Sequence, residues 1–63
     1  MTPLVFRRLK VGDQVSNGTR TFTVTNKNPA GGLADGDSFF VKDNDNGDEG
    51  TLDIGDAGDY TKV

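Results

Sequence analysis

The stretch "VKDNDNGDEGTLDI", Val41–Ile54, places five acidic residues around a single Asn-Gly pair. Asn-Gly supplies the positive φ angles of a two-residue type I′ turn at little steric cost. When Asn46-Gly47 forms the centre of such a turn, the apolar residues of the flanking strands pair on one face of the ladder. These pairs are Val41 with Leu52 and Phe39 with Ile54. The stretch therefore predicts a β-hairpin whose acidic tip is exposed to solvent.

The acids of this hairpin also raise the question of a metal site. A calcium loop of the EF-hand type needs oxygen ligands at fixed spacing, a glycine at position six and a glutamate at position twelve. Counting from Asp43, Gly47 stands at a ligand position, Asp48 stands at the glycine position and Ile54 stands at position twelve. The pattern predicts neither a metal site nor a cofactor, and leaves only weak cation binding at Asp43, Asp45 and Asp48 as an alternative.

The rest of the chain also has strand character. Residues 4–15 predict a first strand region that bends at Gly12, and Asn17-Gly18 predicts a second type I′ turn. Residues 20–26 alternate between apolar and polar side chains, as in a half-buried strand, and residues 60–63 predict a short closing strand. Residues 27–38 are rich in glycine and predict a flexible loop. Leu33 is the residue that could anchor this loop or contact a partner.

Five short strands and two tight turns predict an all-β fold with no substantial helix. We expect a small SH3-like five-stranded barrel or a strongly twisted antiparallel sheet, and a flat three-stranded meander is the alternative. The segment "LKVGDQV" (9–15), followed by a turn and "TFTV" (21–24), resembles strands of SH3-like barrels. This resemblance covers about twenty residues and implies a fold, not a function.

Composition narrows the function classes. The chain has 63 residues, no cysteine and no histidine, so we expect a single small domain (1–63) without disulfides or a zinc site. No apolar run exceeds three residues, which predicts neither a membrane span nor a signal peptide. Nucleophile and phosphate-loop motifs are absent from the sequence, and a core this small leaves little room for a deep pocket. We therefore expect no catalysis and no small-molecule substrate, in a protein of the cytoplasm or of a virion.

Charge is distributed unevenly along the chain. Residues 1–30 hold five cations and one acid, whereas residues 31–63 hold nine acids and two cations. The simplest interpretation is that the two halves lie side by side in one sheet and partly neutralise each other. Used functionally, the same charges would mark surfaces for partners. The candidate binding residues are Arg7, Arg8, Lys10, Leu33, Asp43, Asp45, Asp48 and Glu49.

Three hypotheses follow from these surfaces. The first is a non-catalytic structural or protein-interaction module, such as a phage or other accessory protein, that binds a protein partner or a second copy of itself. The second is an acidic inhibitor whose strand-borne row of carboxylates, with Asp43 and Asp45 on one face, imitates nucleic-acid phosphates. The third is weak nucleic-acid binding through "FRRLK" (6–10). The net charge of −3 makes nucleic acid the least favoured partner.

Overall fold

The computed structural model describes residues 1–30 and 36–63, so Leu33 and the centre of the predicted 27–38 loop lie outside the described residues. Strands dominate the described chain, and its two helices are short. In chain order the elements are α1 (Pro3–Arg7), β1 (Gln14–Ser16), β2 (Thr21–Lys27), β3 (Ser38–Asp43), β4 (Glu49–Asp53), the 3₁₀ helix η1 (Ile54–Asp59) and β5 (Thr61–Lys62).

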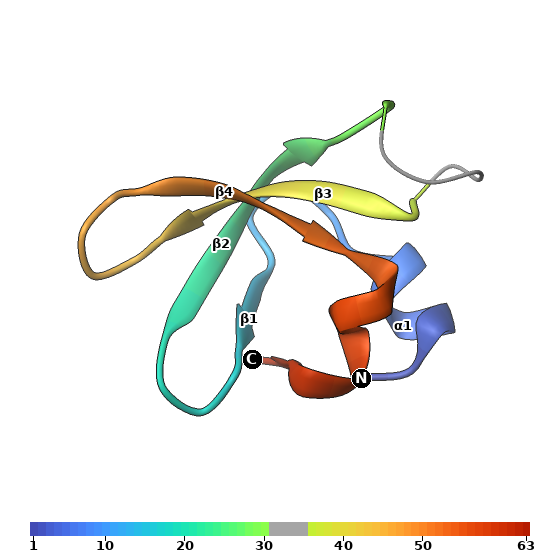
Figure 1. Ribbon diagram of the computed structural model, residues 1–63, viewed down its shortest axis with the longest axis horizontal. Coiled ribbons are helices and arrows are strands. Elements are labelled where there is room, and N and C mark those ends of the chain that lie inside the picture. The colour runs from blue at the N-terminus through green and yellow to red at the C-terminus, as the bar shows by residue number, and fades with distance from the viewer. Residues whose placement is uncertain (31–35) are drawn as a thin grey trace.

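The five strands form one antiparallel sheet in the order β4-β3-β2-β1-β5. The predicted all-β class is confirmed at this level. The sheet is open, with β4 and β5 at its two edges, so a closed SH3-like barrel is not confirmed. The flat three-stranded meander is wrong, because the sheet has five strands and twists strongly. Figure 1 shows β1 and the start of β2 running steeply across the direction of β3 and β4.

The β3–β4 hairpin exists, but its predicted register is wrong by two residues. Phe39 pairs with Leu52, and the last pair before the turn is Lys42 with Glu49. The connection is longer than two residues because the Gly47 N–H donates to the Asp43 carbonyl over 2.9 Å. Gly47 takes a positive φ of 77°, whereas no described non-glycine residue does. A shift of two residues keeps every side chain on its predicted face.

The turn between β1 and β2 differs from its prediction in the same way. Ser16 pairs with Thr21, so four residues rather than two connect these strands. The Asn17 side chain accepts hydrogen bonds from the N–H groups of Thr19 and Arg20, at 2.9 and 2.8 Å. Such Asx-type bonding stabilises the turn without a positive φ at Asn17. The predicted strands at 20–26 and 60–63 are confirmed as β2 and β5.

The first half of the predicted strand at 4–15 is wrong, because the chain begins with a helix. Thr2 caps α1 by accepting a hydrogen bond from the Val5 N–H over 3.3 Å, and Pro3 occupies the first turn. Threonine followed by proline is a helix-start signal, since proline has the helical φ and needs no N–H there. Phe6 and Leu9, three residues apart, are both buried. Gly12 does turn the chain as predicted, with a φ of 95°.

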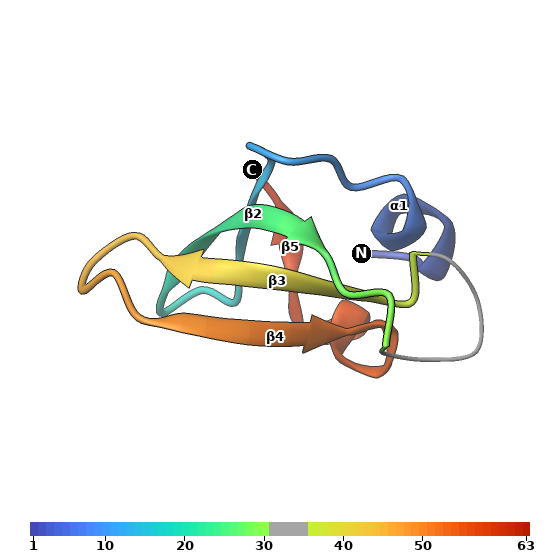
Figure 2. The same cartoon turned by 90° about the horizontal axis from the view of Figure 1, so that it is seen from above.

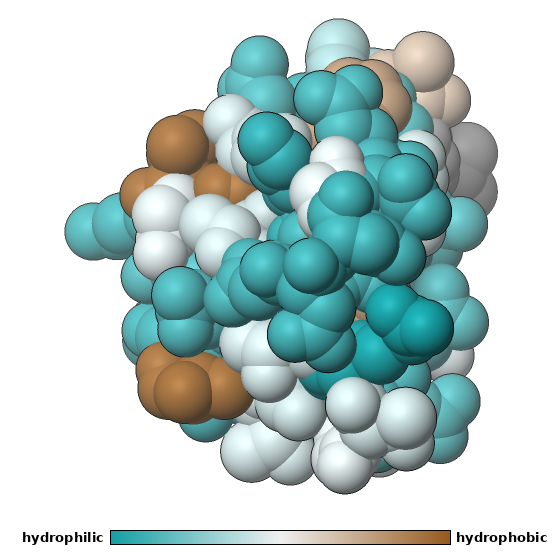
Figure 3. Space-filling model, turned by 90° about the vertical axis from the view of Figure 1, so that its left-hand side faces the viewer, coloured by the Kyte–Doolittle hydropathy of each residue, from teal (hydrophilic) through white to brown (hydrophobic). Residues whose placement is uncertain are grey.

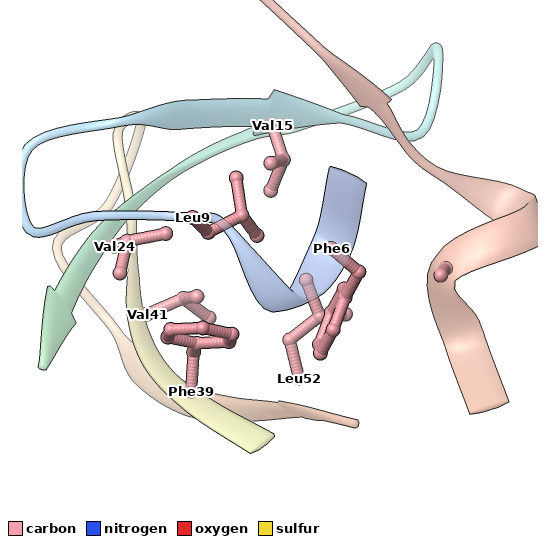
Figure 4. Packing of buried hydrophobic residues seen from close by; sticks show 8 residues of the cluster. Phe6, Leu9, Val15, Val24, Phe39, Val41 and Leu52 are labelled. Carbon is pink, nitrogen blue, oxygen red and sulfur yellow. The ribbon is translucent and has the colours of Figure 1, made fainter. Parts of the chain in front are cut away.

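The core lies between the sheet and the two helices. The buried apolar residues are Phe6, Leu9, Val15, Val24, Phe39, Val41, Leu52 and Ala57. Figure 4 shows Phe6 pointing from α1 toward the sheet, where Phe39 and Leu52 point back at it. The rings of Phe6 and Phe39 meet edge to face, with centroids 5.2 Å apart. This geometry is favourable for aromatic pairs and fixes α1 against β3.

A second contact joins α1 to the residues before β3. Gly36 lies so close to α1 that a β-carbon at this position would stand 3.1 Å from the Arg7 carbonyl oxygen. Its φ of 85° also favours glycine. The next residue, Asp37, accepts a hydrogen bond from the Arg7 Nε over 3.0 Å. The Asp37 carbonyl accepts the Ile54 N–H over 2.8 Å. Gly36 and Asp37, directly before β3, therefore hold α1 and η1 together.

Replacing Phe6 with alanine tests whether the N-terminal segment is part of the core. Removing a fully buried phenylalanine costs about 3–5 kcal/mol. A chain of this length has only about 3–9 kcal/mol of stability to lose. We expect Phe6→Ala to unfold at a much lower denaturant concentration, or to be unfolded in water, as followed by circular dichroism. The exposed neighbour supplies the control, since Leu4→Ala should change stability by less than about 0.5 kcal/mol. Equal effects of the two variants would contradict the packing of α1.

Candidate functional site

A basic groove with a volume of about 750 Å³ lies between the end of α1 and the sheet. Five of the lining residues that the structure describes are cationic, and none of these described lining residues is acidic. The lining residues are Arg7, Arg8, Leu9, Lys10, Val11, Val24, Asn26, Lys27, Phe39 and Lys62. Leu9, Val24 and Phe39 belong to the buried core, so the groove has an apolar floor and a cationic rim.

Three of the cations follow one another at the end of α1. Arg7 ends the helix, and Arg8 and Lys10 lie in the segment that leads to β1. Reciprocal hydrogen bonds hold this segment, since the Lys10 N–H donates to the Asp13 carboxylate over 2.9 Å and the Asp13 N–H donates to the Lys10 carbonyl over 3.0 Å. The Gly12 N–H also donates to the Val24 carbonyl over 2.8 Å. The basic segment is therefore fixed against β2.

The other two cations come from the sheet, where the register places them on its inner face. Lys27 pairs with Phe39, and Lys62 pairs with Val15. Cross-strand partners project from the same face of a sheet, and both partners here are buried core residues. A β-bulge between Val24 and Asn26 changes the alternation in β2, which puts Lys27 on the same face as Val24. Sequence alternation alone places Lys27 on the opposite face.

Ion pairs neutralise part of the groove. Arg7 Nε lies 3.0 Å from the Asp37 carboxylate, and Lys62 Nζ lies 3.7 Å from that of Asp13. Arg8 and Lys10 are exposed, and within residues 1–30 and 36–63 their side chains enter no ion pair. Their charge is therefore the part of the rim that is most available to a bound anion.

The acidic hairpin forms the second candidate surface, but Asp43 is not part of its exposed charge. Asp43 is buried at the end of β3, where one carboxylate oxygen accepts the Asp45 N–H over 2.8 Å. The other oxygen lies 2.8 Å from Arg20 Nη1. The Asp45 N–H and the Arg20 guanidinium stabilise the charged form and hold the pKa of Asp43 below its ordinary value, against the opposing effect of burial.

Three further acids of the hairpin are exposed in the turn or at the start of β4. We call Asp45, Asp48 and Glu49 the acidic tip. No ion pair among the described residues involves these three side chains. Figures 1 and 2 both show this turn projecting at one end of the long axis of the molecule, away from α1. Seen from that end, the surface is mostly hydrophilic, with separate hydrophobic spots (Figure 3).

The structure thus separates the predicted site residues into two surfaces. It brings Arg7, Arg8 and Lys10 together, on a helix end and a turn instead of the predicted strand. The predicted row of carboxylates on one strand is wrong, because β3 ends at Asp43 and Asp45 lies in the turn. Sequence reasoning did not select Lys27 and Lys62 as site residues. Their recruitment depends on the bulge and on the pairing of β5 with β1, for which the sequence carries no separate signal.

Neither a cation site nor a membrane segment is found in the part of the chain that the structure describes. Within residues 1–30 and 36–63, no three acidic side chains gather as they would around a metal ion. Within the same ranges, no helix is long and apolar enough to cross a bilayer.

Comparison with known proteins adds no family to this picture. No protein-family model, no curated protein and no solved structure significantly matches the chain.

The hydrogen bonds of Asp43 predict a specific pH dependence. Because folding lowers the pKa of this carboxyl, its contribution to stability is fully present above the ordinary value of 3.8 and is lost as the pH falls through the folded value. We expect Asp43→Asn to be less stable than the wild type near neutral pH, and the difference to shrink in acid. Urea unfolding at several pH values measures this difference.

Asp45→Asn is the matched control for this experiment. Its carboxylate is exposed, so the same substitution should change stability little at any pH. A stability difference for Asp43→Asn that does not depend on pH would show that the lost interactions do not require the ionised carboxylate.

Proposed function

We propose that this protein is a non-catalytic interaction module that binds an acidic segment of a protein partner in its basic groove. The observation that carries the proposal is the convergence of five cationic side chains from three parts of the chain on one groove, whose lining within residues 1–30 and 36–63 includes no acid. Arg7 and Lys62 are paired with Asp37 and Asp13, so the charge that an anionic partner would compensate is mainly that of the exposed Arg8 and Lys10. The apolar floor formed by Leu9, Val24 and Phe39 favours a segment that also carries apolar side chains.

A protein segment fits the groove better than a nucleic acid does. Binders of single strands stack bases on exposed aromatic rings. Phe39 is the aromatic lining residue of the groove, and its ring is fully buried. A polyphosphate backbone also carries more negative charge than a short acidic segment, so the net charge of −3 opposes its approach more strongly. Direct nucleic-acid binding, the third hypothesis from the sequence, is therefore less well supported than binding of a protein partner.

The acidic-inhibitor hypothesis has less geometric support. Imitation of a phosphate backbone needs a regular row of exposed charge. Asp43 is buried against Arg20, and the acidic tip offers three carboxylates, two in the turn and one at the start of β4. A short acidic turn is better suited to insertion into a small basic site than to covering an extended groove.

An SH3-like relationship remains a hypothesis about the fold. It is supported by the five-stranded antiparallel sheet, by its strong twist, and by the pairing of the last strand with the first one, β5 with β1. The open edge of the sheet separates it from a closed barrel. The hypothesis carries no function, since such scaffolds serve many.

Binding of a short fluorescent peptide of alternating glutamate and leucine tests the proposed function by fluorescence anisotropy. Lys10→Glu should weaken binding roughly twofold to thirtyfold, because an exposed ion pair contributes about 0.2–1 kcal/mol and reversal replaces this attraction by a repulsion of similar size. Affinity should also fall as salt is added.

Lys42→Glu is the matched control, because it makes the same substitution at an exposed lysine outside the groove and changes net charge equally. A single-stranded oligonucleotide serves as the competing probe. A second outcome is that the protein binds the oligonucleotide and not the peptide, and loses this binding in Lys10→Glu. That result would show that the partner of the groove is a nucleic acid instead of a protein. Equal effects of the two lysine variants on peptide binding would overturn the assignment of the groove.

A further inference from the structure

We infer that the partner of the basic groove is a second copy of this chain, whose acidic tip enters the groove. This inference rests on the proposed function and names the acidic segment. Each copy carries one surface of each sign. None of the three residues of the acidic tip lines the groove, so both surfaces are available on the same molecule.

The positions of the two surfaces favour contact between copies. The acidic tip projects at one end of a molecule with extents of 30 × 20 × 16 Å, and the cations Arg7 and Arg8 lie at α1, toward the other end. The tip of a copy therefore points away from its own α1. A projecting turn is the part of the molecule that a neighbouring copy can contact first.

The tip is held in shape before it binds. The Asp43 N–H donates to the Asp48 carbonyl over 2.8 Å, and the Asp48 N–H donates to the Asn46 side chain over 2.9 Å. The Asn44 N–H donates to the Thr21 carbonyl of the adjacent β2 strand over 2.9 Å. These bonds fix the backbone that carries the exposed carboxylates, so little conformational entropy is lost on association.

The free charges on the two sides are complementary. Asp45, Asp48 and Glu49 enter no ion pair among the described residues, and the side chains of Arg8 and Lys10 enter none either. Pairing them between copies satisfies both sets without breaking a described ion pair. Contacts of this kind are screened by salt, so association should be favoured at low ionic strength and high protein concentration.

A contact between two different surfaces leaves one free tip and one free groove on every pair of copies. Such a heterologous interface adds further copies head to tail and gives open chains or rings instead of a closed two-fold dimer. The expected signature is a mean mass that rises continuously with protein concentration.

Sedimentation velocity of the full chain over a range of concentrations measures this behaviour. A tip variant, Asp45→Asn with Asp48→Asn and Glu49→Gln, and a groove variant, Arg8→Gln with Lys10→Gln, should each remain monomeric. All five positions are exposed, so both variants should keep the fold, which circular dichroism verifies. Asp48→Asn can be compared with Asp59→Asn, an equal charge change at an exposed aspartate on η1.

Mixing the two variants is the decisive step. The intact groove of the tip variant can bind the intact tip of the groove variant, and the product has no second usable interface. The mixture should therefore form a dimer that does not grow further, although each variant alone is monomeric. A wild type that stays monomeric at low salt, or a mixture that stays monomeric, would overturn the inference.

The peptide experiment separates this inference from the proposed function. If the wild type is monomeric but binds the acidic peptide in a Lys10-dependent way, the proposed function stands and the self-association inference is wrong. If the wild type is monomeric and does not bind the peptide, both the proposed function and the self-association inference are wrong. Wild-type association that survives in the tip variant and the groove variant would place the interface elsewhere on the molecule.

Discussion

The edge-to-face contact between Phe6 and Phe39 is the interaction on which the rest of this structure depends. It fixes α1 against β3, and the chain leaving α1 then runs over the sheet with Leu9 buried beneath it. Together with the hydrogen bond from Gly12 to Val24 of β2, this packing places Arg8 and Lys10 in the same groove as the lysines of β2 and β5. The same packing that completes a small core therefore also assembles the basic groove.

Asp43 plays the corresponding part at the other end of the molecule. Its carboxylate accepts hydrogen bonds from the turn and from Arg20, and in this way converts one acid of an acid-rich stretch into an internal anchor. The neighbouring acids remain exposed because the turn that Asp43 organises turns them outward. Within a few residues, one acid is therefore buried and paired while its neighbours are exposed. The net charge of the hairpin does not distinguish these two roles.

The sequence predicted the features that local chemistry determines and missed those that depend on distant pairing. Asn46-Gly47 identified the hairpin, yet the number of residues in the turn was set by the hydrogen bonds of Asp43, which shifted the register by two. Thr2-Pro3 carried the signal for α1, but the apolar run that follows was interpreted as a strand. Lys27 could not be placed on the inner face, because a bulge has no reliable sequence pattern.

The open sheet gives the two charged surfaces a common physical origin. In a closed barrel the inner face is sealed by neighbouring strands, and lysines facing inward would have to be buried at a high cost. Here Lys27 and Lys62 share the inner face with buried residues but lie at strand ends, where their amines reach the groove. The β3–β4 turn carries exposed acids at the opposite end of the molecule, away from Arg8 and Lys10. Among the described residues, Arg8 and Lys10 at one end and the acidic tip at the other therefore stay outside the ion pairs of the fold, and on this unpaired charge the proposed contact between copies depends.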